Sequence, residues 1–269
     1  MRPRLRQLGA SRRALPDFVI IGTQKAATTS LMRYLKEHPD VVTEPGVGEV
    51  HFFDNHWDRG EQFYRSFFPT QAHIDRQHAR TSRVTLTGEK TPYYMMHPLV
   101  PERARQTIPG ARLIAILRNP VDRAAAQHRM NFNAGVEELG LLDAIAAEPE
   151  RVDGALARIA DGSHHGVGGP AQIYSYVARS RYAEQLDRWL EHFPREQLLL
   201  IRSEDLGADP DATYETVLHH LHLAPHAPAF ARHNEARKPY SVAPEAAARL
   251  EELFREPNRD LAERYGISW

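Results

Sequence analysis

The residues between Gly22 and Ser30 have the types and spacing of an anion-binding loop. An unbroken apolar run at 18–21 ends at Gly22, which is typical of a strand buried on both faces. From Thr28 the apolar residues recur at helical spacing, so we expect a helix to begin there. A strand, a short turn and a helix N-terminus place backbone N–H groups and the ammonium group of Lys25 around one point. We expect this point to bind an anion.

The position of Lys25 distinguishes this loop from that of the nucleotide triphosphatases. Their pattern, G-x-x-x-x-G-K-[ST], places the lysine directly before the hydroxyl that binds magnesium. Here Lys25 lies three residues after Gly22 and three before Thr28, and no second glycine follows. A P-loop kinase or NTPase would also need an acidic residue at a strand end, so this class is the less favoured alternative.

The loop resembles, as G-x-x-K-x-A-x-T-[TS], the 5′-phosphosulfate loop of sulfotransferases that use 3′-phosphoadenosine 5′-phosphosulfate (PAPS). The similarity is particularly to the branch that contains the heparan sulfate N- and O-sulfotransferases and many bacterial homologues. The resemblance implies that PAPS is the co-substrate, that 3′-phosphoadenosine 5′-phosphate (PAP) is the product, and that no metal is required. It also implies a set of residues around the 5′-phosphate: Gln24, Lys25, Ala26, Ala27, Thr28, Thr29 and Ser30.

A second phrase, Glu49-Val-His-Phe-Phe-Asp54, closely matches K-E-x-x-F-F of the same branch, where the glutamate is the proposed catalytic base. The resemblance implies that Glu49 takes the proton of the acceptor, assisted or replaced by His51. The adjacent aromatic side chains would dehydrate the carboxylate and raise its pKa toward a value that suits a general base. Glu44 is a competing candidate that lacks the two phenylalanines. The lysine that precedes this glutamate in the family is Gly48 here, so another group must hold the sulfuryl oxygens.

A third phrase, Gly88-Glu-Lys-Thr-Pro-Tyr-Tyr94, resembles the E-K-T-P-x-Y turn of the family and follows an expected short strand at 84–87. In the family the lysine of this turn reaches the sulfuryl group and the acceptor. Lys90 is therefore implied as a second catalytic cation beside Lys25. A lysine on a solvated turn is the alternative interpretation.

A fourth phrase, Arg118-Asn-Pro-Val-Asp-Arg-Ala124, closely matches the 3′-phosphate motif of the family and follows an expected strand at 112–117. Ligands of open α/β sheets bind at the carboxyl ends of strands, and a guanidinium group binds phosphate through two N–H groups. We therefore assign Arg118 to the 3′-phosphate. The phosphate-binding serine of relatives is Ala126 here, and its contact could be replaced by Arg123 or Gln127.

A basic loop near the C-terminus contains Arg237 and Lys238. In the family a loop at this place often closes over the nucleotide. The resemblance therefore adds these two residues to the candidates for cofactor binding.

The elements that must position these residues predict a single α/β domain. With 269 residues and 42% hydrophobic content, the chain can bury one full core. We expect a central, mostly parallel sheet flanked by helices, the P-loop-like sulfotransferase fold, with core strands near 18–21, 84–88, 112–117 and 197–201. Helices are expected near 28–36, 61–68, 98–107, 137–147, 152–159, 174–193, 210–223 and 244–263.

The chain divides into a basic, flexible N-terminal arm at 1–16 and a sulfotransferase domain at 17–269. The arm carries five arginines and no apolar core, so it does not have the pattern of a secretory signal. The irregular segment 133–172 is expected to be mobile and to lie on the acceptor side. It contains His164 and His165, but no histidine group has a recognised zinc spacing.

Composition excludes several classes of function. A net charge of −1 gives no global field for nucleic acid, and the absence of cysteine excludes thiolate metal sites and disulfides. No apolar run approaches the roughly 18 residues of a membrane span. We expect a cytoplasmic protein whose oligomeric state stays open.

The phrases together predict in-line transfer of a sulfuryl group from PAPS to a hydroxyl or amine. The acceptor is a glycan, a lipid or a small metabolite, and the sequence does not choose among them. A non-catalytic relative that binds PAP or a glycan is the main alternative, because Gly48 and Ala126 both depart from the pattern of the family.

Overall fold

The computed structural model describes residues 9–163, 168–229 and 242–269. Its centre is a four-stranded parallel sheet in the order β2-β1-β3-β4. The strands are Phe18–Gly22 (β1), Gly88–Lys90 (β2), Arg112–Leu117 (β3) and Leu198–Arg202 (β4). The predicted parallel α/β fold is confirmed, and β1, β3 and β4 lie within one residue of their predicted positions.

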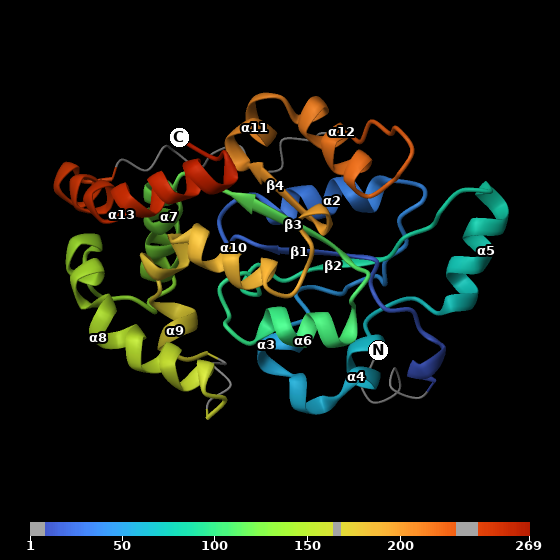
Figure 1. The fold of residues 1–269 in the computed structure, drawn as a ribbon, viewed down its shortest axis with the longest axis horizontal. Coiled ribbons are helices and arrows are strands. Elements are labelled where there is room, and N and C mark those ends of the chain that lie inside the picture. The colour runs from blue at the N-terminus through green and yellow to red at the C-terminus, as the bar shows by residue number, and fades with distance from the viewer. Residues whose placement is uncertain (1–8, 164–167, 230–241) are drawn as a thin grey trace.

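Alternate side chains of β1 enter two separate cores, because successive residues of a strand point to opposite faces. Phe18 and Ile20 pack with α2 (Thr28–Glu37) and α12 (Pro210–His220). Val19 and Ile21 pack on the other face with α3 (Phe52–Asn55), α6 (Val100–Thr107) and α10 (Tyr182–Leu190). Figure 1 shows these two layers of helices above and below the sheet.

A third group of helices packs beside the sheet, at the left of Figure 1. It contains α7 (Pro120–Asn133), α8 (Leu141–Ala160) and α13 (Pro244–Tyr265), which share a core of their own. The prediction of two helices at 137–147 and 152–159 was wrong, because α8 is continuous through Pro149. One buried face extends along the whole helix and holds it together. The greater part of the segment that we expected to be irregular is therefore regular helix.

The remaining elements, apart from α5, are single turns or little more. They are Ala10–Arg12 (η1), Trp57–Arg59 (η2), Glu61–Arg65 (α4), Gln71–Thr81 (α5), Pro170–Ile173 (α9), Ala178–Ser180 (η3), Arg195–Gln197 (η4) and Ser203–Ala208 (α11). The helix expected at 174–193 is thus divided between η3 and α10. Among the described helices, none is both long and apolar enough to cross a bilayer.

The second strand begins later than the sequence predicted. β2 covers Gly88–Lys90, whereas Leu86 forms an isolated bridge to Val41. A side chain at Gly88 would collide with the ring of Phe18, so close packing of β2 on β1 requires glycine there.

Residues 9–16, which we assigned to a flexible arm, instead pack against the domain. Ala10 and Ala14 are buried. The Arg13 guanidinium group donates to Glu44 Oε1 at 3.1 Å, and it also binds the carbonyl of Phe68. The arm residues 1–8 lie outside the described part of the chain.

Candidate active site

The predicted site residues gather at the carboxyl edge of the sheet. Lys25 follows β1, Lys90 ends β2 and Arg118 follows β3. Because the strands are parallel, these ends lie on the same edge, where ligands of open α/β sheets bind.

The loop after β1 turns sharply into α2. A Cβ at Gly22 would lie 2.7 Å from Cβ of Met95, so only glycine fits where the strand ends. Ala27 is the N-cap residue of α2 and has a left-handed backbone, and its carbonyl accepts from the amides of Ser30 and Leu31. The first N–H groups of a helix have no partner within the helix, so the start of α2 at Thr28 offers donors for an anion.

Positive charge is concentrated around this loop. Arg118 Nη1 donates to the carbonyl of Lys25 at 3.2 Å, and Lys25 Nζ lies 3.7 Å from Met130 Sδ. Burial, followed by the positive charges of Arg129 and Arg118, lowers the pKa of Lys25. A bound anion would stabilise the charged form of Lys25 against these two neighbours.

Glu49 lies at the centre of a hydrogen-bonded chain of charged groups. Lys90 Nζ donates to Glu49 Oε1 at 2.7 Å and to Thr29 Oγ1 at 3.1 Å. On its other side, Glu49 Oε2 lies 3.3 Å from His51 Nε2. The structure thus brings Glu49, His51 and Lys90 together and links them to the loop through Thr29.

The pKa of Glu49 is lowered, which corrects the prediction that its surroundings raise it. Burial alone would raise this pKa, but hydrogen bonds from His51 and Lys90, with their positive charges, lower it to about 2. Burial is the largest single influence on this pKa, but the two charged partners together outweigh it. Phe52 and Phe53 are buried in the core, whereas the Glu49 side chain is 38% exposed.

His51 is held in its protonated form. Burial disfavours its charge, but hydrogen bonds and negative charge from Asp54 and Glu49 raise its pKa to about 10. Nδ1 lies 2.6 Å from Asp54 Oδ2, so at neutral pH the imidazolium donates from both nitrogens. In this state His51 orients Glu49 and has no lone pair with which to accept a proton.

Asp54 is a site residue that the sequence reasoning missed. Its side chain is fully buried, and its carboxylate binds His51 and the amide of Asn55. The available signal was a carboxylate three residues after the histidine, a spacing that brings the two groups together on one turn of helix.

The 3′-phosphate motif forms the start of α7. Asn119 caps this helix by accepting from the amides of Val121 and Asp122. The carbonyl of Arg118 accepts from Tyr182 Oη at 2.8 Å, and the Arg118 side chain is one third exposed. The motif therefore presents the guanidinium group of Arg118 toward the loop that carries Lys25.

Neither residue that we considered as a substitute for the missing serine is available. Arg123 is fully buried and binds Ser180, Gln127 and the carbonyl of Tyr176. Burial lowers the pKa of Arg123 to about 10. Gln127 donates in turn to the carbonyl of Ile173. Both side chains join α7 to the segment before α10. Neither of them therefore replaces the hydroxyl that is missing at Ala126.

Arg179 is a second residue that sequence reasoning missed. It is buried, and its guanidinium group binds Gln24 of the loop and stacks over the ring of Tyr93, 5.0 Å from the ring centre. It therefore fixes Gln24 from the side of η3. The pattern around it gave no signal, because a lone arginine before a helix is usually solvated.

Some predicted residues cannot be placed. Arg237, Lys238, His164 and His165 lie outside the described residues. Within the described stretches, no group of three His, Asp or Glu residues is arranged to hold a metal ion.

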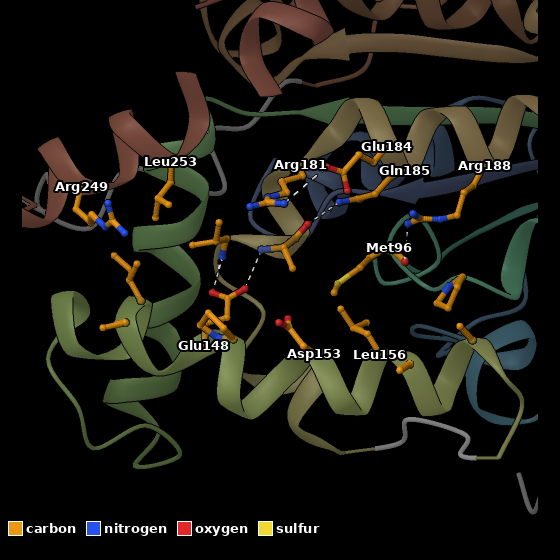
Figure 2. Close-up of a pocket in the computed structure, with 18 of the residues that line it drawn as sticks. Met96, Glu148, Asp153, Leu156, Arg181, Glu184, Gln185, Arg188, Arg249 and Leu253 are labelled. Atoms are coloured by element: carbon orange, nitrogen blue, oxygen red, sulfur yellow. Dashed lines mark hydrogen bonds and ion pairs between the residues drawn. The ribbon is translucent and has the colours of Figure 1, made fainter. Parts of the chain in front are cut away.

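Of two cavities in the described part of the chain, one lies at these residues and a larger one lies apart from them. A small one of about 180 Å³ has Lys90 in its wall, and the other charged residues of the wall are Arg33, Lys36 and Glu44. A larger one of about 670 Å³ lies between α8, α10 and α13. Figure 2 shows Asp153 and Leu156 of α8 facing Gln185 and Arg188 of α10 across it. None of the predicted site residues within the described stretches lines the larger cavity.

Comparison with known proteins identifies the family of this chain. The family model described as a sulfotransferase domain matches residues 15–233. The chain is 32% identical over 202 residues to heparan sulfate glucosamine 3-O-sulfotransferase 6 of Homo sapiens, which covers 75% of this chain and 51% of the relative. It is 29% identical over 224 residues to bifunctional heparan sulfate N-deacetylase/N-sulfotransferase 3 of Homo sapiens, with 79% and 23% covered.

A solved structure is similar over almost the whole chain. The sulfotransferase from Alicyclobacillus acidocaldarius is 25% identical, with a TM-score of 0.71 over 95% of this chain and 98% of that one. The chain spans about half the length of the curated 3-O-sulfotransferases that it matches. Because the model of the sulfotransferase domain matches most of its length, this chain belongs to the sulfotransferase family.

Proposed function

We propose that this protein transfers the sulfuryl group of PAPS to a hydroxyl or amine of a glycan. The observation that carries the proposal is the contact of Lys90 with both Glu49 and Thr29, because it joins a carboxylate base to the phosphosulfate loop. Lys90 lies beside the carboxylate, and Lys25 is part of the loop itself. Such an arrangement serves the transfer of an anionic group by electrostatic stabilisation.

The nucleotide is held at its two phosphate-bearing ends. The amides and hydroxyls at the start of α2, with Gln24 and Lys25, bind the 5′-phosphate, and Arg118 binds the 3′-phosphate. The positive charges of Arg118 and Arg129 around Lys25, whose pKa they help to lower, support this assignment. Arg237 and Lys238 remain candidates for closing over the nucleotide.

Glu49 serves as the base only after its partners are redistributed. A carboxylate with a pKa of about 2 is a poor proton acceptor while Lys90 and His51 both bind it. Lys90 moves its hydrogen bond from Glu49 to the sulfuryl and bridging oxygens as the group transfers. Glu49 thereby becomes more basic at the moment when the hydroxyl or amine of the acceptor loses its proton. His51, fixed by Asp54, keeps the freed carboxylate aimed at the acceptor.

The cavity beside Lys90 supports an anionic acceptor. Arg33 and Lys36 of α2 contribute to its wall. Burial, followed by the charges of Lys90 and Arg33, lowers the pKa of Lys36, so an acceptor with carboxylate or sulfate groups relieves this repulsion. The curated relatives named above carry heparan sulfate, a polyanionic glycan, in their names, which agrees with this choice.

Transfer of radiolabelled sulfate from PAPS tests the proposal directly. The expected result is label on an anionic glycan such as a heparan sulfate precursor, no label with Glu49→Gln, and no requirement for magnesium. Tight binding of PAP without transfer to any glycan, lipid or small hydroxyl compound would instead identify a non-catalytic binding protein. Phosphate transfer from ATP with magnesium would identify a kinase.

A further inference from the structure

Glu89 is a buried carboxyl group that none of the proposed chemical steps uses. It lies in the middle of β2 and is 3% exposed. Three hydroxyl groups donate to it: those of Tyr64 at 2.6 Å, Thr91 at 2.8 Å and Tyr94 at 3.3 Å. A buried carboxyl with three donors is built to accept hydrogen bonds, and the residues that it organises show what it does.

Two of the three hydroxyls also bind the backbone of the segment after Glu49. Thr91 Oγ1 accepts from the amides of Val50 at 3.1 Å and His51 at 3.5 Å, and Tyr94 Oη accepts from the amide of Phe52 at 2.8 Å. A hydroxyl has a single proton to donate. Because Thr91 and Tyr94 give theirs to Glu89, their lone pairs point to these three consecutive amides.

We propose that Glu89 is a positioning residue for sulfuryl transfer, because its carboxylate orients the hydroxyls that hold the backbone of Glu49 and His51. The inference rests on the proposed function of Glu49. His51 has a left-handed backbone with a φ of 50°, which is unfavourable for a residue with a side chain and needs support from its surroundings. The hydrogen bond from the backbone amide of His51 to Thr91 Oγ1 supplies part of that support.

The same network fixes the other half of the catalytic pair. Lys90 stands between Glu89 and Thr91 in the chain, so both of its neighbours are anchored. Glu89 therefore helps to fix the backbone of Lys90 and, through Thr91, the backbone next to Glu49. The position of Lys90 Nζ relative to Glu49 Oε1 depends on both. Small displacements of reacting groups reduce turnover strongly, so loosening this network affects kcat more than nucleotide binding.

The carboxylate form of Glu89 is the one that serves this role. Burial raises its pKa to about 7, while the hydroxyls of Tyr64 and Thr91 oppose the rise and the charge of Asp54 adds to it. Protonation would turn one carboxyl oxygen into a donor, so that the group could no longer accept from all three hydroxyls. The contribution of Glu89 to turnover is accordingly expected above pH 7.

Four variants separate positioning from general stability. Glu89→Gln and Thr91→Val break the connection, Thr91→Ser restores the hydroxyl, and Tyr64→Phe is the matched control. Tyr64 donates to the same carboxylate with a 2.6 Å bond but binds none of the amides after Glu49. The assays are run at pH 9, because Tyr64→Phe removes a hydrogen bond that lowers the pKa of Glu89 and the control must keep this group ionised. There we expect Glu89→Gln and Thr91→Val to lower kcat about ten- to a hundredfold with PAP affinity unchanged. Thr91→Ser and Tyr64→Phe should keep kcat within about threefold, although Tyr64→Phe loses a buried hydrogen bond.

A second measurement does not depend on activity. NMR titration of His51, assigned with His51→Gln, reports whether the imidazole still lies between Asp54 and Glu49. We expect its pKa to fall in Glu89→Gln and Thr91→Val and to stay raised in Tyr64→Phe. An unchanged His51 titration in all variants overturns the positioning role whether or not transfer is detected. A kcat loss no larger than that of Tyr64→Phe overturns it as well, whereas inactivity of the unmodified protein contradicts the proposed function alone.

Discussion

Lys90 and Glu49, 41 residues apart in the sequence, form an ion pair of 2.7 Å at the edge of the sheet. The pair holds the carboxylate ionised and shields its lone pair at the same time. A carboxylate held in this way keeps its charge at every physiological pH, and its reactivity is regulated by where the lysine binds. The following predictions test this relationship and the assignments around it.

Replacing Glu49 by glutamine should abolish most of the turnover. The amide keeps the size and hydrogen bonding of the side chain but has no basic lone pair, so we expect a loss of about a hundredfold or more. Affinity for PAP, measured by calorimetry, should not change. Near-normal transfer by Glu49→Gln combined with loss in His51→Ala would show that the histidine is the base.

Removing Lys90 should raise the pKa of Glu49. Lys90 lowers this pKa by a hydrogen bond and by its charge, so Lys90→Met should move it upward from about 2, while His51 still holds it below the ordinary value. NMR titration of the Glu49 carboxyl carbon measures the shift. Lys36→Met removes a nearby charge that does not contact Glu49, and it serves as the control. Equal shifts in both variants would mean that the 2.7 Å contact has no special effect.

The protein should bind PAP far more tightly than AMP or ADP. The loop around Lys25 and the guanidinium group of Arg118 together require phosphate at both ends of the nucleoside. Calorimetry with the three nucleotides, with and without magnesium, measures this preference. Arg118→Ala should remove most of it, and because Arg118 also binds the carbonyl of Lys25 in the loop, a smaller loss of affinity is expected for AMP. Equal affinities for all three ligands in the unmodified protein would contradict the assignment.

Ala126→Ser should tighten PAP binding by up to about tenfold, which corresponds to about 1.4 kcal/mol. The structure leaves this position without a polar substitute, because Arg123 and Gln127 bind residues 173–180 instead. The gain should disappear for adenosine 5′-phosphosulfate, which has no 3′-phosphate. A similar gain for both ligands would show that this part of α7 does not face the 3′-phosphate.

Arg33 and Lys36 should affect the acceptor and not the nucleotide. Replacing either with alanine is expected to raise KM for an anionic glycan several-fold, since each exposed charge pair contributes up to about 1 kcal/mol. The KM for PAPS should stay level. Arg76, a basic residue of α5, offers a control substitution away from the site. Loss of nucleotide binding in Arg33→Ala or Lys36→Ala would contradict the assignment of these two residues to the acceptor.

The strands were predictable where burial leaves a hydrophobic pattern. β1, β3 and β4 are apolar runs, and their predicted positions were correct to within a residue. β2 was misplaced because its central residue is Glu89, whose burial depends on hydroxyls from Tyr64, Thr91 and Tyr94. A local pattern cannot reveal a carboxyl group that is made compatible with the core by residues elsewhere in the chain.

The sequence motifs of the candidate site were predictable, but the contacts between their side chains were not. Lys25, Glu49, Lys90 and Arg118 were found from their motifs, and the structure places them at one edge. The predicted direction of the Glu49 pKa shift was wrong, because the hydrogen bonds and charges of His51 and Lys90 outweigh the effect of burial, and the sequence does not show these contacts. Asp54 could have been found from its spacing to His51. Arg179 could not, because its contact with Gln24 joins residues that are far apart in the sequence.

The backbone of the loop after β1 has a consequence for the energetics of recognition. Lys25 and Ala27 have φ values of 73° and 67°, a conformation that costs a residue with a side chain about 1–3 kcal/mol. Contacts inside the protein hold this curvature: Arg118 binds the carbonyl of Lys25, and the amide of Ala26 donates to Thr23. The unfavourable conformation is therefore imposed by folding of the domain. A receptor whose shape is set in this way loses little conformational entropy when it captures an anion, so more of the interaction energy appears as affinity.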